Sequence, residues 1–156
     1  MRSFLSAVVV LAGMSFTWAG EEKVALDKLP KAVSESIKKR FPKGEMSSAV
    51  KETVDKKTTF EISLKDGESK YDVNINEDGT ITGFEKEVAV KDMPKAVVAA
   101  AVAKYPTAKQ KKGEEVYTVA DGKETLAYYE VIFEIDGKDV EVEVLANGTL
   151  KPVEKK

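Results

Sequence analysis

The chain has 156 residues and a formal net charge of −2, and it contains neither cysteine nor histidine. Without these residue types it lacks the usual general base, the thiol nucleophile and the main zinc ligands, and no disulfide can form. Its 25 basic and 27 acidic residues include no polybasic block suited to nucleic acid or an anionic membrane. We therefore expect no enzyme, no cofactor and no nucleic-acid partner.

The first 19 residues have the pattern of a secretory signal peptide. Arg2 supplies a positive charge, the stretch from Phe4 to Phe16 is almost uncharged, and small residues stand before Gly20. The apolar stretch is short for a transmembrane helix, so retention as an anchor is the less favoured alternative. We expect residues 1–19 to be removed and residues 20–156 to form a periplasmic or secreted domain without membrane attachment.

The rest of the chain contains an internal repeat. Residues 24–33 read VALDKLPKAV, and residues 88–97 read VAVKDMPKAV. Each half closes on Gly-Thr followed by an aliphatic residue, at 79–81 and at 148–150. A repeat of this kind indicates one supersecondary unit built twice. We therefore expect a single domain built from repeats 24–87 and 88–156.

Each repeat begins with a pattern typical of a short helix. Pro30 and Pro94 suit the first helical turn, whereas Pro42 and Pro106 forbid continuation of the helix. Between them an apolar residue recurs every four positions: Leu29, Val33, Ile37 and Phe41, then Met93, Val97, Ala101 and Tyr105. One apolar stripe on each helix predicts that the helix packs on a core through that side.

Alternating strands follow each helix. The clearest alternation, with Asp-Gly turns between the paired segments, covers residues 60–64, 71–75, 129–135 and 140–144. Weaker strands are expected at residues 47–54, 80–87, 115–120 and 149–154. The predicted fold class is α+β, with two tandem helix-plus-four-strand repeats forming one antiparallel sheet and the helices packed on one face.

The period of two in a strand assigns the residues of the second repeat to opposite faces of the sheet. The face away from the helices is expected to carry Tyr128, Glu130, Ile132, Glu134, Glu141 and Glu143. Two large apolar residues among four glutamates favour a partner-binding surface. The simpler alternatives are a solvated sheet face, or packing of Tyr128 and Ile132 against the segment 109–124.

The segment from Asn74 to Glu85 offers an alternative function. Asn74, Asn76 and Asp78 place oxygen atoms at positions 1, 3 and 5 of a calcium loop, with Gly79 at 6 and Glu85 at 12. The residues before this segment alternate as a strand, where an EF-hand needs a helix, and a hairpin turn explains the same residues. Calcium or small-ligand binding by this loop and the strand-face carboxylates is therefore the second hypothesis.

Taken together, these motifs resemble the PepSY-like, beta-lactamase-inhibitor-like (BLIP-like) family of exported bacterial proteins. The resemblance rests on the proline-started helix closed by aromatic-Pro, the Asp-Gly hairpin and the closing Asp/Asn-Gly-Thr-aliphatic turn, in two copies. It implies tandem helix-plus-four-strand units in one antiparallel sheet. It also implies a non-catalytic protein-binding module that inhibits or regulates a secreted hydrolase or peptidase. Binding is expected through the sheet face or the hairpin loops.

Overall fold

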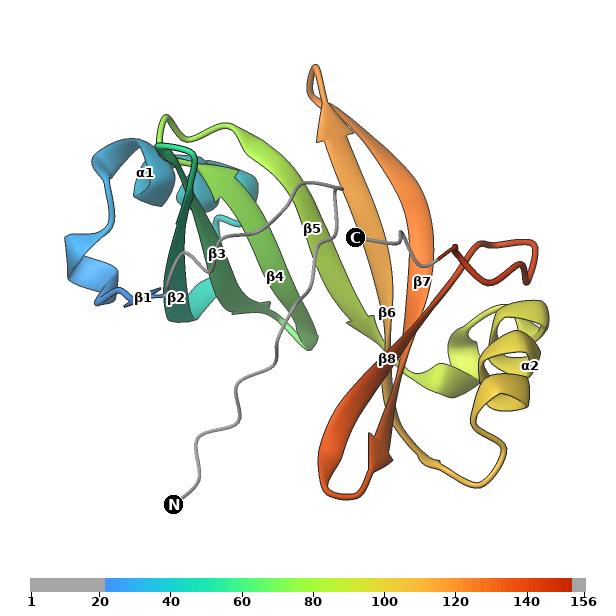
Figure 1. The fold of residues 1–156 in the computed structure, drawn as a ribbon. Helices are drawn as coiled ribbons and strands as arrows, with labels where there is room; N and C mark the ends of the chain where they lie inside the picture. The colour runs from blue at the N-terminus through green and yellow to red at the C-terminus, as the bar shows by residue number, and fades with distance from the viewer. Residues whose placement is uncertain (1–21, 153–156) are drawn as a thin grey trace.

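The computed structural model describes residues 22–152 and contains a single antiparallel sheet whose eight strands lie in chain order (Figure 1). The strands are β1 (Glu22–Lys23), β2 (Glu45–Val54), β3 (Lys57–Asp66), β4 (Ser69–Asn76), β5 (Ile81–Val88), β6 (Lys109–Ala120), β7 (Lys123–Ile135) and β8 (Lys138–Val144). The helices are α1 (Lys31–Arg40) and α2 (Lys95–Lys104). The α+β class and the antiparallel sheet predicted from the sequence are confirmed.

The predicted signal peptide lies outside the described residues. Within residues 22–152, no helix has the length and apolar character needed to cross a membrane.

The proline and aromatic-proline signals set the ends of both helices. Helix α1 starts directly after Pro30 and ends at Phe41, whose backbone N–H donates to the Ile37 carbonyl over 2.8 Å. Helix α2 likewise starts after Pro94 and ends at Tyr105. Seven of the eight residues of the predicted apolar stripes are buried: Leu29, Val33, Ile37, Phe41, Met93, Val97 and Ala101.

Buried apolar residues form two clusters, one beneath each helix. The first joins Val33 and Ile37 of α1 to strand residues such as Ile62 of β3. The second joins Val97 of α2 to residues such as Val131 of β7. Figure 1 shows the two helices at opposite ends of the sheet, α1 near the first strands and α2 near β7 and β8. Each helix therefore covers its own half of the sheet.

Strand register places both clusters on the same face of the sheet. Phe84 of β5 pairs with Tyr117 of β6, and Glu115, two residues from Tyr117, pairs with Tyr129 of β7. Because residues two apart share a face, the core residues of β5 and of β7 point to the same side. The other side of the sheet carries no helix among the described residues.

Both closing turns of the sequence repeat dock on a helix. At Gly79, φ is +86°, and a Cβ there would meet the Ala32 carbonyl oxygen of α1 at 2.7 Å. At Gly148, φ is +84°, and a Cβ would meet the Ala96 carbonyl oxygen of α2 at 3.0 Å. Glycine is required at both turns because positive φ and close backbone approach each exclude a side chain. This explains the duplicated Gly-Thr motif physically.

Several strand boundaries differ from the sequence prediction, among them the start of β7, which lies at Lys123 rather than at residue 129. Strand β1 is a two-residue edge strand too short to give an alternation signal. Strand β6 begins at Lys109 rather than near Glu115, because its first half, KQKKGE, has no apolar residue to mark it. The strand predicted at 149–154 is represented, up to residue 152, by a single bridge between Leu150 and Val144.

Candidate functional site: an acidic sheet face

Carboxylates are concentrated on the face of the sheet that points away from both helices. Their positions follow from strand register: Asp72 pairs with Glu85, while Glu130 pairs with Glu114 on one side and with Glu143 on the other. We call this surface the acidic face and define it by Asp72, Glu85, Glu114, Glu130, Glu141 and Glu143. It extends from β4 to β8 and so spans both halves of the chain.

Three of these glutamates are buried despite lying on a face without a helix. Glu85, Glu114 and Glu130 are each only 4% exposed. Carboxylates are rarely buried to this extent unless they are paired, because loss of hydration disfavours the charged form. The acidic face therefore differs from an ordinary solvated sheet face, because three of its carboxyl groups are largely removed from water.

Few cations balance this charge. Lys112 Nζ lies 2.5 Å from Glu114 Oε1, and Lys151 Nζ lies 2.7 Å from Glu143 Oε2. Within residues 22–152, no side chain forms a hydrogen bond or an ion pair with the carboxylates of Glu85 or Glu130. Two buried acidic groups are thus left without a direct partner.

The pKa values of these carboxylates respond to burial and crowding. Burial, reinforced by the charges of Glu130 and Glu114, raises the pKa of Glu85 to about 9. Burial and the neighbouring glutamates raise the pKa of Glu130 to about 8, and burial raises that of Glu141 to about 6. Near neutral pH these carboxyl groups therefore bind protons readily. A bound cation that took the place of those protons would also be stabilised by the carboxylates.

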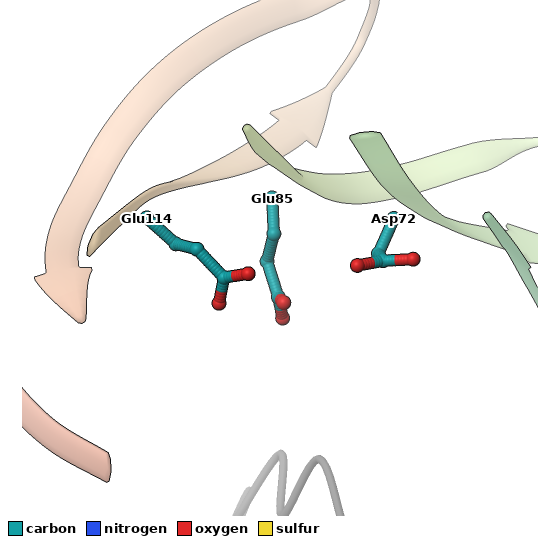
Figure 2. A group of neighbouring side chains, drawn as sticks. All are labelled: Asp72, Glu85 and Glu114. Atoms are coloured by element: carbon teal, nitrogen blue, oxygen red, sulfur yellow. The ribbon is translucent and has the colours of Figure 1, made fainter. Parts of the chain in front are cut away.

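Three of the carboxylates converge. Oxygen atoms of Asp72, Glu85 and Glu114 lie within 4.8 Å of one another. Figure 2 shows these side chains projecting to the same side of their strands, with Glu85 between the other two. A groove beside them is lined by Asp72, Glu114, Lys112 and Ser63, so the cluster is at the edge of a surface depression.

The structure places the predicted partner-binding residues on this face but corrects their exposure. Ile132 is only 2% exposed, so the expectation that it stands out toward solvent is wrong. It lies between Lys112 on β6 and Glu141 on β8, whose long side chains flank it. Glu134 is exposed, and Glu141 and Glu143 are half-buried.

Tyr128, in contrast, is half-buried and its ring already holds a cation. The Nζ atom of Lys151 lies 3.9 Å from the centroid of the Tyr128 ring and also pairs with Glu143. Burial and the surrounding glutamates raise the pKa of the Tyr128 hydroxyl, so this group stays neutral at physiological pH. Ring and carboxylate together thus hold an ammonium group on this face.

The residues of the predicted calcium loop do not form a calcium-binding loop in the structure. Asp78 lies in the β4–β5 turn, where Oδ1 accepts a hydrogen bond from the Thr80 backbone N–H over 2.9 Å. Asn76 is the last residue of β4, and its carbonyl accepts the Gly79 N–H. Glu85 instead lies farther along β5, opposite Asp72. Asn74 pairs with Gly83, which is nearer the turn than Glu85. The hairpin therefore explains the motif and separates Asp78 from Glu85.

Sequence reasoning missed Glu114 and Lys112. The strand predicted there began at Glu115, one residue after Glu114, because the preceding segment is polar throughout. Extending the period of two backward from Val116 would have placed both residues on the same face as Glu85. Glu130 was correctly assigned to the outer face.

Comparison with known proteins identifies the fold. Neither a family model nor a curated protein matches the sequence. Solved structures do match: a BLIP-like protein from Bacteroides fragilis has a TM-score of 0.55 and 16% identity, covering 78% of this chain and 82% of its own. A protein of the DUF2874 family from Bacteroides uniformis has a TM-score of 0.59 and 12% identity over 78% and 85%. A protein described as periplasmic from Bacteroides eggerthii has a TM-score of 0.60 and 13% identity over 78% and 84%.

At such low identity these similarities show the fold alone. The resemblance to the BLIP-like family expected from the sequence is confirmed at that level, and the shared fold covers most of both chains in each comparison.

Proposed function

We propose that this protein is a non-catalytic, exported binding module, periplasmic or secreted, that recognises a basic segment of another exported protein through the acidic face. The signal-peptide pattern supports export, and one structural neighbour is described as periplasmic. Another neighbour is described as BLIP-like, which agrees with a protein-binding role.

The observation that carries the proposal is the position of Lys151. Its ammonium group lies between the Tyr128 ring and the Glu143 carboxylate, at 3.9 Å and 2.7 Å respectively. An aromatic ring beside a carboxylate is a favourable environment for a lysine or arginine side chain. Elsewhere on the face, no cation from residues 22–152 pairs with Glu85 or Glu130. A partner with several basic residues would complement the unpaired carboxylates of the face in the same way.

Charge on the face also selects the partner. The face carries carboxylates on five neighbouring strands and few paired cations, so it attracts a basic surface at long range and repels an acidic one. A basic side chain of the partner that displaced Lys151 would gain the aromatic contact with Tyr128, a kind of contact that contributes strongly to binding at protein interfaces. A secreted enzyme with a basic rim around its active site is the class of partner that this chemistry fits, and an inhibitory or regulatory role follows from covering such a rim.

The test is capture of partners by immobilised mature protein, residues 20–156, from a periplasmic extract. A paired variant, Glu141→Gln with Glu143→Gln, removes two half-buried charges from the face while retaining side-chain shape. We expect the variant to lose the captured protein, and the association rate with that protein to fall and to depend less on salt.

A matched control is Glu35→Gln with Glu77→Gln, which makes the same change in net charge at a helix and a turn away from the face. This control should capture as the unmodified protein does. Equal capture by all three proteins, or an acidic captured partner, would refute the proposal.

A further inference from the structure

The three carboxylates that converge on the acidic face come from three adjacent strands. Asp72 and Glu85 are direct partners on β4 and β5. Glu85 lies opposite Val116 of β6, and Glu114 is two residues from Val116 on the same side of that strand. Their oxygen atoms lie within 4.8 Å of one another. Because strands of one sheet fix these backbone positions, the cluster does not depend on a flexible loop.

Each carboxylate in the cluster has a different environment. Asp72 Oδ1 accepts a hydrogen bond from the Ser63 hydroxyl over 2.6 Å, and Glu114 pairs with Lys112. Glu85, between them, is 4% exposed and has no hydrogen bond or ion pair with any residue of the described range 22–152. A buried carboxylate that points into a cluster without a partner is a free ligand group.

A second unpartnered carboxylate reinforces the first. Glu130 on β7 is also 4% exposed, lies directly opposite Glu114, and acts on Glu85 as the strongest of the neighbouring charges. Among residues 22–152, Lys112 is the one cation paired with these four carboxylates, which therefore share a single positive charge. Carboxylates that are buried and crowded in this way are stabilised by protons or by an added cation.

We propose that Asp72, Glu85 and Glu114 bind a divalent cation, namely Ca²⁺, on the acidic face. All the donors are carboxylate oxygens, which are the ligands of hard cations rather than of zinc or copper. A cation bound to oxygens at about 2.3–2.6 Å can span ligand oxygens up to about 4.6–5.2 Å apart, whereas Mg²⁺ at about 2.0–2.1 Å requires a tighter arrangement. Separations of up to 4.8 Å are within the reach of Ca²⁺, and its flexible coordination suits three carboxylates held on separate strands better than the strict octahedron of Mg²⁺.

This site differs from the loop suggested by the sequence. Of the four loop residues only Glu85 takes part, and its companions Asp72 and Glu114 come from strands that pair with β5 on either side. The inference also stands apart from partner binding, because it concerns the isolated protein and uses the β4–β6 part of the face.

Titration of CaCl₂ into the metal-free mature protein tests the site by calorimetry and by thermal melting. We expect one ion per chain, with a dissociation constant of about 10⁻⁴–10⁻³ M, as in extracellular calcium modules. At 10 mM CaCl₂ the melting temperature should rise by roughly 5–10 °C. MgCl₂ should give a smaller rise, and NaCl at equal ionic strength should give none.

Two variants assign the response to these residues. Glu85→Gln and Asp72→Asn should each abolish the calcium-dependent rise. Glu85→Gln should also raise the melting temperature in EDTA, because glutamine removes a buried carboxyl group that must either take up a proton or carry an unpartnered charge on folding. That rise would show that the variant folds. Glu134→Gln, an equal charge change at an exposed position of β7, should retain the full calcium response.

Absence of calcium binding to the unmodified protein would overturn the inference, as would an unchanged response in both cluster variants. Either result would leave capture of a basic partner untouched, so the two proposals fail separately.

Discussion

At the scale of single residues, Glu130 is a carboxyl group buried on the face of the sheet that carries no helix among residues 22–152. It pairs with Glu114 on one side and Glu143 on the other, and it is 4% exposed. Three glutamates in adjacent strands would repel one another if all were ionised. Burial, reinforced by the charges of Glu141, Glu114 and Glu143, raises the pKa of Glu130.

The pKa of Glu130 predicts a pH-dependent stability. Burial raises it from 4.5 to about 8, so between these values the folded state holds a proton that the unfolded state has lost. Stability should therefore fall as pH rises through this window, by at most about 1.4 kcal/mol per pH unit from this group. Melting in EDTA from pH 5 to pH 8.5 should show a shallower decline for Glu130→Gln than for the unmodified protein. Parallel curves would contradict the prediction.

Ile132 leads to a second prediction at this scale. Because it is 2% exposed, replacement by threonine should destabilise the protein by about 2 kcal/mol through lost burial and a hydroxyl without a partner. Glu134→Thr, two residues away on the same face but exposed, serves as the control and should change stability by less than about 0.5 kcal/mol. Urea unfolding measures both values. Equal effects would show that Ile132 is a surface residue after all.

The sequence predicted the face of each of these residues but not its burial. Alternation in β7 correctly placed Tyr128, Glu130 and Ile132 opposite the core, because side-chain direction follows from local geometry alone. Burial depends instead on what the neighbouring strands carry. Glu114 and Lys112 lie in the polar half of β6, which local patterns did not identify as a strand, so their contribution to covering this face was not foreseen.

At the scale of secondary-structure elements, the duplicated Gly-Thr motif joins a hairpin to a helix. In the β4–β5 turn Asp78 accepts the Thr80 N–H, and in the second half Asn147 accepts the Thr149 N–H, each over 2.9 Å. These side-chain bonds shape the turn so that its glycine lies against the helix backbone. The residues that suggested calcium binding thus hold the element pair together.

Gly79→Ala tests this docking. An alanine at positive φ costs about 1–2 kcal/mol, and the added Cβ would meet the Ala32 carbonyl oxygen at 2.7 Å, so we expect a total loss of about 3 kcal/mol. Gly67→Ala is the matched control, because Gly67 also has positive φ, +63°, but no atom lies within 4 Å of its added Cβ. The difference between the two unfolding free energies measures the docking contact. Equal losses would show that the turn does not press on α1.

Element positions were the most predictable level of structure. Both helices and the strongly alternating strands follow from local sequence, since proline, Asp-Gly turns and periodic apolar residues act within a few positions. The carboxylate cluster was not predictable in the same way. Asp72, Glu85 and Glu114 come together only because β4, β5 and β6 adopt one particular register, and no local pattern fixes a register between β5 and β6, which a helix separates.

At the scale of the whole molecule, two apolar clusters share one sheet. The shared boundary is the pairing of β5 with β6, from Gly83 opposite Thr118 to Val88 opposite Gly113. Across it the rings of Phe84 and Tyr117 stack with centroids 4.8 Å apart. Arg40 at the end of α1 also reaches Glu124 of β7 over 2.6 Å. These contacts should make unfolding of one half costly for the other.

Hydrogen exchange can test whether the halves unfold together. Val97 is fully buried beneath α2, so Val97→Ala should lower stability by about 2 kcal/mol through lost burial and a cavity. The most protected amides of β3 lie in the other half of the sheet. If the sheet unfolds as one unit, their free energy of protection should fall by the same amount as the stability of the whole protein. Lys95→Ala, at an exposed position of the same helix, should leave β3 unchanged. Unaltered protection of β3 in the Val97 variant would show that the two halves unfold independently. In that case β5 and β6 could separate while both apolar clusters remained intact. The carboxylate cluster that bridges these two strands would then open without global unfolding.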